Sequence, residues 1–443
     1  MFTATGGVSG STVGNMTAAR PLAALITGVV TLSLTAGPSL AAPPQQREIT
    51  YRTWTSSADF LKGTRSGTTV VNGALRFGSA TGTTSYVDPF GDGTAKAYEQ
   101  ASWVSPEVKT DYGLTELVAS WNATTPAGTW IEVAMSGHSD EGTTTKWYVL
   151  GRWNRGDDTA AGDIHRTSVS GQKDTTGTVS VDTFVAAAGR SLDRWRLKVT
   201  LYRLAGTTKV PVLQSVGAMA SRLPADETVP VSRGGGAWGR VLDVPTYSQE
   251  THIGHYPQWD GGGEAWCSAT STAMVLDYYR RGPSKAETAW VDPADPDPQV
   301  DHSARSVFDY KYDGAGNWPF NTAYAGTRGL DAFVTRLRSL TEAEQFIKAG
   351  IPLVASLSFE KDELPGAGYG TNGHLMVIVG FAKNGDVVVN DPASHLIKSN
   401  DEVRTVYNRA AFENAWIPHS GGIVYVIHPA GKRLPPRTHQ ANW

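Results

Sequence analysis

The sequence contains a single cysteine among its 443 residues. It therefore cannot form an intramolecular disulfide, which excludes a disulfide-stabilised scaffold. Neither sign of charge predominates, because 39 Lys and Arg stand against 42 Asp and Glu, for a formal net charge of −3. No broad basic surface is expected, and nucleic acid is not expected as a partner. Beyond the N-terminus, no segment is long and apolar enough to suggest a membrane span.

The N-terminal segment has the pattern of an export signal. Residues 1–41 carry one charge, Arg20, followed by an apolar run from Leu22 to Leu34. Because Ser39 and Ala41 are small residues ahead of the expected cut, we predict a signal peptide that is cleaved after Ala41. We therefore expect a secreted, extracellular protein with no membrane attachment after cleavage. A retained anchor is the alternative, but the Gly and Pro residues of this segment weaken a spanning helix.

Residues 49–223 have the pattern of short strands separated by turns. The dipeptide at 72–73, Asn-Gly, predicts a tight hairpin between 68–71 and 74–77. Over 195–201, apolar residues alternate with Arg, Lys and Thr, as in a strand with one buried face. Segments 116–122 and 130–135 alternate similarly, and no helix is convincing. This half is predicted to be an all-β sandwich, jelly-roll-like in type.

Seven of the 14 tryptophans lie in this first half. Most are expected in its core, although Trp147 and Trp153 could provide a stacking platform for sugars. The sequence of this half suggests no group of residues that could act together in catalysis. Its expected role is accessory or binding, with a cell wall or glycan as the conceivable partner.

The remaining chain divides into a linker, a second domain and a tail. Residues 224–240 include three consecutive glycines and lose all periodicity, which is typical of a linker. Residues 241–430 mix helical and strand patterns, and 431–443 form a C-terminal tail. Helices are predicted from Cys267 to the Gly-Pro at 282–283, over 330–337, and from Thr341, where Glu344 completes a capping box, to Gly350.

Four strands are predicted after these helices, over 353–359, 375–381, 387–390 and 423–427. The Asn-Gly at 384–385 predicts a hairpin turn between the second and third of them. Helices followed by an antiparallel sheet indicate an α+β domain.

Cys267 stands where a nucleophile could be activated. It follows the glycines at 261–263 and begins a predicted helix. The unsatisfied N–H groups and the positive dipole end of the helix would favour the thiolate, which is the attacking form. A small buried hydrophobe is the alternative interpretation of a lone cysteine.

His374 is the candidate base for this thiol. It lies where a loop enters an apolar strand, and Asp391 follows 17 residues later, beyond the predicted hairpin. Because a hairpin reverses direction, the end of its second strand returns beside the start of its first. The carboxylate of Asp391 could then hold the tautomer and orientation of the imidazole.

These motifs resemble a known family. Asp-Val-Pro-Thr-Tyr-Ser-Gln at 243–249, Trp-Cys-Ser-Ala-Thr at 266–270, Gly-His at 373–374 and Asn-Asp-Pro at 390–392 are similar to those of the C39 and C39-like peptidases, a branch of the papain-like superfamily. The resemblance covers about 242–427. It implies a papain-like cysteine peptidase domain with Cys267 as nucleophile, His374 as acid and base, Asp391 as orienting residue and Gln249 as oxyanion donor.

The sequence departs from the family pattern in two places. Ser268-Ala269 follows the cysteine, where many members have Gly-Pro, and Gln249 lies 18 residues before Cys267, a longer gap than is usual. Gln258 is the competing oxyanion donor, since it is closer in sequence, but it lacks the Pro-x-Tyr-Ser context. The chain shows no transporter segments, so the double-glycine leader substrates of the best-known members are not carried over.

The expected activity is hydrolysis of a peptide or protein substrate, with no cofactor and no metal. The alternatives are a cell-wall amidase or transglutaminase of similar chemistry, or a catalytically inactive surface or glycan-binding protein. The alternating Pro and Asp of 292–301 suggest a solvated loop rather than a calcium site, because proline-spaced carboxylates do not easily converge. His302 and His395 fit surface histidines, and the aromatic segment 317–324 could line a substrate groove or pack as an ordinary loop.

Overall fold

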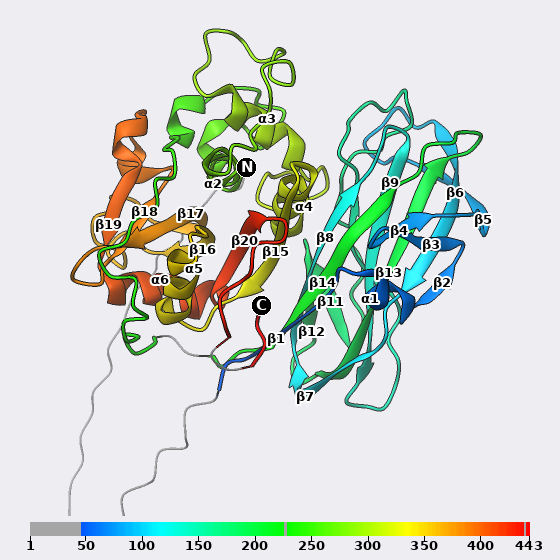
Figure 1. Ribbon diagram of the computed structural model, residues 1–443, viewed down its shortest axis with the longest axis horizontal. Helices are drawn as coiled ribbons and strands as arrows, with labels where there is room; N and C mark the ends of the chain where they lie inside the picture. The colour runs from blue at the N-terminus through cyan, green and yellow to red at the C-terminus, as the bar shows by residue number, and fades with distance from the viewer. Residues whose placement is uncertain (1–45, 226–227, 438–439) are drawn as a thin grey trace, which may run out of the picture. The chain divides into compact units, whose positions relative to one another are not determined.

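The computed structural model describes residues 46–225, 228–437 and 440–443, in which three antiparallel sheets predominate over a few helices (Figure 1). The predicted signal peptide, 1–41, lies outside these residues. Over the described part of the chain, no helix is both long enough and apolar enough to cross a bilayer.

Two seven-stranded sheets make up the first half. The first has the order β11-β12-β8-β14-β4-β3, with β1 also paired to β14, and the second has the order β10-β9-β13-β6-β2, with β5 on β6 and β7 on β13. The first sheet contains β1 (Glu48–Trp54), β3 (Thr68–Val71), β4 (Ala74–Phe77), β8 (Glu116–Thr124), β11 (Gly177–Ser180), β12 (Thr183–Ala186) and β14 (Val212–Arg222). The second contains β2 (Thr64–Ser66), β5 (Gly82–Val87), β6 (Ala95–Val104), β7 (Val108–Leu114), β9 (Thr129–Ser139), β10 (Tyr148–Trp153) and β13 (Leu192–Leu204). The short helix α1 spans Ser57–Leu61.

The two sheets are joined by aromatic packing, because Trp54 of β1 makes edge contacts with Trp103 of β6 and Trp195 of β13. All three indoles are almost completely buried. The predicted β-rich domain is therefore confirmed, and the hairpin over 68–77 has the expected register, with Val71 opposite Ala74. Trp153 is also buried, so it offers no sugar platform, and cationic side chains of Arg196 and Lys198 lie over the ring of Trp147.

The second half contains one six-stranded sheet with the order β15-β20-β16-β17-β18-β19. Its strands are β15 (Leu330–Arg336), β16 (Leu353–Phe359), β17 (Thr371–Phe381), β18 (Val387–Asn390), β19 (Arg404–Tyr407) and β20 (Ile423–Pro429). Its helices are α2 (Cys267–Tyr278), α3 (Pro298–Val307), α4 (Trp318–Thr327), α5 (Leu340–Lys348) and α6 (Arg409–Ser420). Helix α2 begins at Cys267 and the hairpin β17–β18 turns at Asn384-Gly385, as expected.

The helix predicted over 330–337 is wrong, because these residues form the edge strand β15. Nearly every side chain of this strand is buried, so its apolar residues follow no strict alternation and their positions also match a helical spacing. The capping box at Thr341 is wrong as well. Thr341 lies inside α5, and the buried carboxylate of Glu344 accepts backbone N–H groups of Gly235 and Ala237.

The solvated loop predicted over 292–301 is wrong at its C-terminal end. Pro298 begins α3, and Asp301 is completely buried in that helix. His302, expected at the surface, is partly buried against the hydroxyl of Tyr324, and burial lowers its pKa to about 4. The alternating prolines suggested a loop, but Pro298 is the first residue of a helix, a position where proline is well tolerated.

Candidate active site

A cleft of about 1220 Å³ is lined by three of the four residues predicted to carry the chemistry. Cys267, His374 and Gln249 line it, and Asp391 lies behind His374. The rival donor Gln258 is exposed and does not line this cleft, and neither does the exposed His395. The fold therefore brings together residues that are separated by up to 142 positions (391 minus 249) in the sequence.

Helix α2 carries the thiol. Cys267 is its first residue and is half-buried, so its N–H belongs to the donors that a helix leaves without an intrahelical acceptor. The helix packs on the strand that carries the histidine, because Ser271 Oγ donates to the carbonyl of Leu375 at 3.0 Å. Residues 268–276 of the helix are completely or almost completely buried, which fixes the orientation of its first turn.

The β17–β18 hairpin carries the histidine and the carboxylate. Val377 of β17 is opposite Asn390 of β18, so Asp391 continues past the strand end toward His374. His374 Nε2 lies 2.7 Å from Asp391 Oδ1. This contact leaves Nδ1 of the imidazole for exchange of a proton with Cys267.

Two tyrosines that the sequence did not single out complete the environment of Asp391. The hydroxyl of Tyr407 donates to Oδ2 at 2.7 Å, and that of Tyr369 lies 2.8 Å from the same oxygen. The N–H of Ala393 donates to Oδ1 at 3.0 Å. Tyr407 comes from β19, whose pairing with β18 was not predicted. The carboxylate is therefore held by four donors in a buried position.

These contacts set the charges of the pair. Burial opposes the charged form of His374, but Asp391 and Cys267 together outweigh it and raise the pKa of the imidazole to about 10. Burial likewise opposes the charged form of Asp391, yet His374 and the two tyrosine hydroxyls keep the pKa of its carboxyl below 3.8. At neutral pH the pair is an imidazolium beside a carboxylate.

Gln249 lies on a short 3₁₀ turn, Gln249–His252, next to the chain that precedes the nucleophile. Its Nε2 donates to the carbonyl of Glu264 at 2.7 Å. A primary amide has two N–H donors, so one remains for a ligand in the cleft. Gly263 allows this close approach, because a Cβ there would lie 2.5 Å from the carbonyl oxygen of Gln249.

The first half of the chain supplies part of the cleft lining. Glu116 at the start of β8 and residues 180–183 at the β11–β12 turn are among its lining residues. Asp182 of this turn accepts the N–H of Trp318, the first residue of α4, at 2.8 Å. Burial raises the pKa of Asp182 to about 7. Trp318 also lines the cleft, whereas Phe320 is buried against Trp121 and Trp153.

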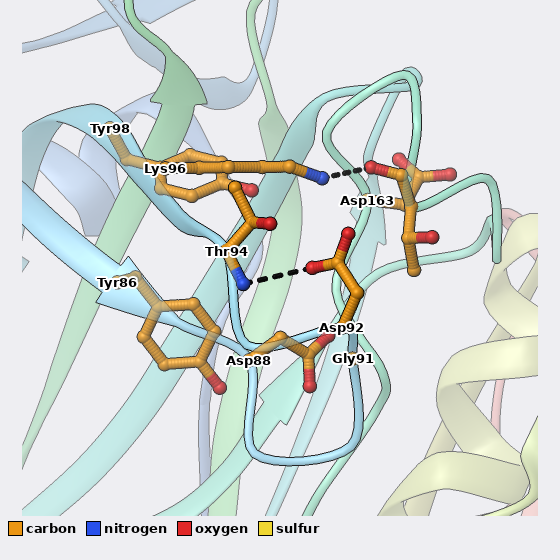
Figure 2. Close-up of a pocket in the computed structure, with 9 residues that line it drawn as sticks. Tyr86, Asp88, Gly91, Asp92, Thr94, Lys96, Tyr98 and Asp163 are labelled. Carbon is orange, nitrogen blue, oxygen red and sulfur yellow. Dashed lines mark hydrogen bonds between the residues drawn. The ribbon is translucent and has the colours of Figure 1, made fainter.

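A second depression lies on the first half, around Asp88, Asp92 and Asp163 (Figure 2). Its volume is about 20 Å³, which is room for about one water molecule. The carboxylate of Asp88 already binds His165 at 2.9 Å, and that of Asp163 accepts the N–H of Gly128 at 2.8 Å. These acids serve local structure.

Comparison with known families identifies the class of protein. Residues 241–423 match the Peptidase C39-like family, and residues 50–221 match the Peptidase C39 N-terminal domain. The family matches therefore support a peptidase. The C39-like assignment therefore holds for residues 241–423, and the two matched segments together cover most of the chain.

Two solved structures are similar to the chain. One is a Bacillus anthracis protein assigned as a C39-like peptidase, with 20% identity and a TM-score of 0.26 over 42% of this chain and 96% of that one. The other is a LamA variant from Z. galactanivorans in complex with laminaritriose and laminaritetraose, with 13% identity and a TM-score of 0.17 over 35% of this chain and 81% of that one. The search of curated proteins found no match.

Proposed function

We propose that the chain is a cysteine peptidase that hydrolyses peptide bonds through Cys267, with His374 as acid and base. Asp391 orients the imidazole, and Gln249 donates to the oxyanion. The observation that carries this proposal is the 2.7 Å contact between His374 Nε2 and Asp391 Oδ1 beside a cleft that Cys267 also lines. A hydrogen-bonded base with a third group behind it is the arrangement that activates a nucleophile.

The reaction begins from a thiolate and an imidazolium, a state favoured by the pKa of about 10 for His374. The sulfur of Cys267 bonds to the substrate carbonyl carbon, and the carbonyl oxygen becomes an oxyanion. The backbone N–H of Cys267 and the side-chain N–H of Gln249 donate to that oxygen. The intermediate then collapses with cleavage of the C–N bond, and the proton on His374 Nδ1 passes to the leaving amine.

Hydrolysis of the thioester completes the cycle. Neutral His374 takes a proton from water, and the resulting hydroxide bonds to the acyl carbon. Collapse of this second intermediate breaks the C–S bond, releases the carboxylic acid product and restores the thiolate beside the imidazolium. Asp391 stays ionised throughout and keeps Nε2 protonated and oriented.

The proposal extends to the fold and the location of the protein. The second half is a papain-like domain, because the cysteine begins a helix that packs on an antiparallel sheet carrying the histidine. Residues 1–41 direct export and are removed. The β-rich first half contributes a wall of the substrate cleft through Glu116 and Asp182.

Product analysis tests the proposal directly. The chain from residue 42 onward and its Cys267→Ala variant are incubated separately with a mixed peptide library and with peptidoglycan, and the products are identified by mass spectrometry. Cleaved peptides that appear only with the intact thiol support a peptidase. Products from peptidoglycan alone would indicate a wall amidase instead. A folded protein that releases no product from either substrate would contradict both.

The exposed histidine His395 provides a matched control. His395→Gln is expected to keep full activity, because this side chain is outside the cleft, whereas His374→Gln is expected to lose it. Equal loss in the two variants would show that activity does not depend on the His374–Asp391 pair.

A further inference from the structure

A second group of chemically capable side chains lies apart from the cleft. His252 ends the 3₁₀ turn that begins with Gln249, His255 follows three residues later, and Asp301 lies in α3. One ligand atom from each lies within 4.8 Å of those of the other two. His252 and Asp301 are completely buried, and the side chain of His255 is 19% exposed. None of the three lines the catalytic cleft.

The distances within this cluster are longer than those of a good hydrogen bond. Nδ1 of His252 and Nδ1 of His255 each lie 3.3 Å from Oδ1 of Asp301, and Nδ1 of His252 also lies 3.2 Å from Oδ2. The catalytic pair His374–Asp391 is much closer, at 2.7 Å. Ligand atoms bound tetrahedrally to zinc at about 2.0–2.1 Å stand about 3.3 Å apart. Each of these nitrogen–oxygen distances therefore has the spacing of two ligands on one metal ion, and all three ligand atoms lie within 4.8 Å of one another.

The charge of the cluster also favours a cation. Among the described residues, Asp301 has no Lys or Arg ion-pair partner, and its buried Oδ2 accepts no hydrogen bond. A buried carboxylate without a compensating charge is costly. A second carboxylate, Asp295, lies 3.3 Å from Nε2 of His255. Two carboxylates facing two imidazoles match the charge of a divalent ion.

Asp295 lies where it can orient the ring of His255. A histidine that binds a metal through one ring nitrogen commonly donates the N–H of the other to a carboxylate, which fixes its tautomer. His255 has this arrangement, with Nδ1 toward Asp301 and Nε2 toward Asp295. We propose that His252, His255 and Asp301 form a zinc site, with two imidazole nitrogens and a carboxylate as protein ligands and water at the fourth position.

The site would act on structure rather than on the reacting bond. It joins the turn that carries Gln249 to α3, in a chain whose single cysteine allows no internal disulfide. The ring of His252 lies 6.1 Å from that of Trp266, the residue before the nucleophile. A bound ion would hold this turn in place, and the stability of the folded chain would rise with metal binding.

Metal analysis must separate this site from the catalytic thiol, which could itself bind zinc. The wild-type chain and the Cys267→Ala variant are dialysed against zinc, freed of unbound metal and analysed by mass spectrometry for metal content. Both are expected to retain a stoichiometric zinc ion, and their unfolding temperature should fall with a chelator and recover with zinc. Absence of stoichiometric zinc together with an unchanged unfolding temperature would overturn the proposal.

Two further variants, made on the Cys267→Ala chain, locate the ion. Asp301→Asn should lose the zinc and the chelator response. His138→Gln, which removes another histidine paired to an aspartate at 3.1 Å, should keep both. Stoichiometric zinc in the Asp301→Asn chain would overturn the assignment of the ligands. If that chain does not fold, metal content and chelator response of the Cys267→Ala chain still decide whether the site exists.

Discussion

The side chain of Asn122 pairs with both backbone groups of Ala332. Its Nδ2 donates to the carbonyl of Ala332 at 2.7 Å, and its Oδ1 accepts the N–H at 3.0 Å. Two residues along β8, Ser120 Oγ accepts the N–H of Val334 at 2.8 Å. Side chains of the β-rich half therefore form hydrogen bonds with backbone groups at the free edge of β15, where a further strand would otherwise pair.

Replacement of Asn122 tests how much this pairing stabilises the chain. In Asn122→Ala both backbone groups of Ala332 lose their partners in a buried position, so we expect the free energy of unfolding to fall by about 2–6 kcal/mol. Chemical denaturation measures the loss. Thr124→Ala, on the same face of β8 but exposed, loses only a hydrogen bond from Gln214 and should change stability by at most about 1 kcal/mol. Equal effects of the two changes would argue against the pairing.

The charge on Asp391 should set the alkaline limit of activity. His374 holds its proton up to a pKa of about 10, so the stability of its pairing with Asp391 is fully present below the ordinary histidine pKa of 6.5 and is lost as the pH rises through 10. Asp391→Asn removes the negative charge that sustains this shift. The alkaline limb of kcat/KM should then move to lower pH, as a pH–rate profile would reveal.

Tyr407→Phe is the matched control for that change, since it removes one hydrogen bond to Asp391 but no charge. Its alkaline limb should move less than that of Asp391→Asn. An Asp391→Asn enzyme with an unaltered alkaline limb would show that another group holds the imidazolium.

The oxyanion assignment predicts a difference between two glutamines. Gln249→Ala should lower kcat by about 10²–10³, with a smaller effect on KM, because the lost donor acts mainly in the transition state. Gln258→Ala should leave both constants near their wild-type values, since that side chain is exposed and outside the cleft. The reverse order of effects would transfer the role to Gln258.

Trp443 anchors the last described segment, 440–443. Its indole is almost completely buried, stacks edge-on against Phe346 and donates to the carbonyl of Pro435 at 2.9 Å. Trp443→Ala should reduce the free energy of unfolding by about 3–5 kcal/mol. Trp238→Ala, at an indole that is 49% exposed, should cost about 1 kcal/mol for its lost hydrogen bond to Glu344. Thermal or chemical unfolding compares them, and equal losses would contradict an anchoring role for Trp443.

Local patterns were sufficient to predict the elements that carry the candidate site. The helix beginning at Cys267 and the hairpin between His374 and Asp391 each follow from signals within a few residues: a glycine-rich entry, helical spacing and an Asn-Gly turn. Because turn position fixes register, the contact of His374 with Asp391 could be anticipated from the sequence. The β-rich first half was predictable for the same reason, since segments such as 195–201 alternate apolar and polar residues and an Asn-Gly turn marks the hairpin over 68–77.

Features that depend on distant partners could not be predicted in this way. Nearly every side chain of β15 is buried, so no alternation marks it as a strand, and β8 contacts its outer edge through side chains that no local pattern reveals. Tyr407 reaches Asp391 only through the pairing of β19 with β18. Asp301 meets His252 and His255 across 46 to 49 positions, and the proline-rich approach to α3 indicated a loop instead.

The last described residues close onto the first described strand. The N–H of Tyr51 donates to the carbonyl of Ala441, and Asn442 Nδ2 donates to the carbonyl of Arg336 in β15. During synthesis on the ribosome, these C-terminal residues emerge after every other described segment. The contacts of these residues with β1 and β15 can therefore form only after residue 443 has been translated. A pause before that point leaves the nascent chain without them.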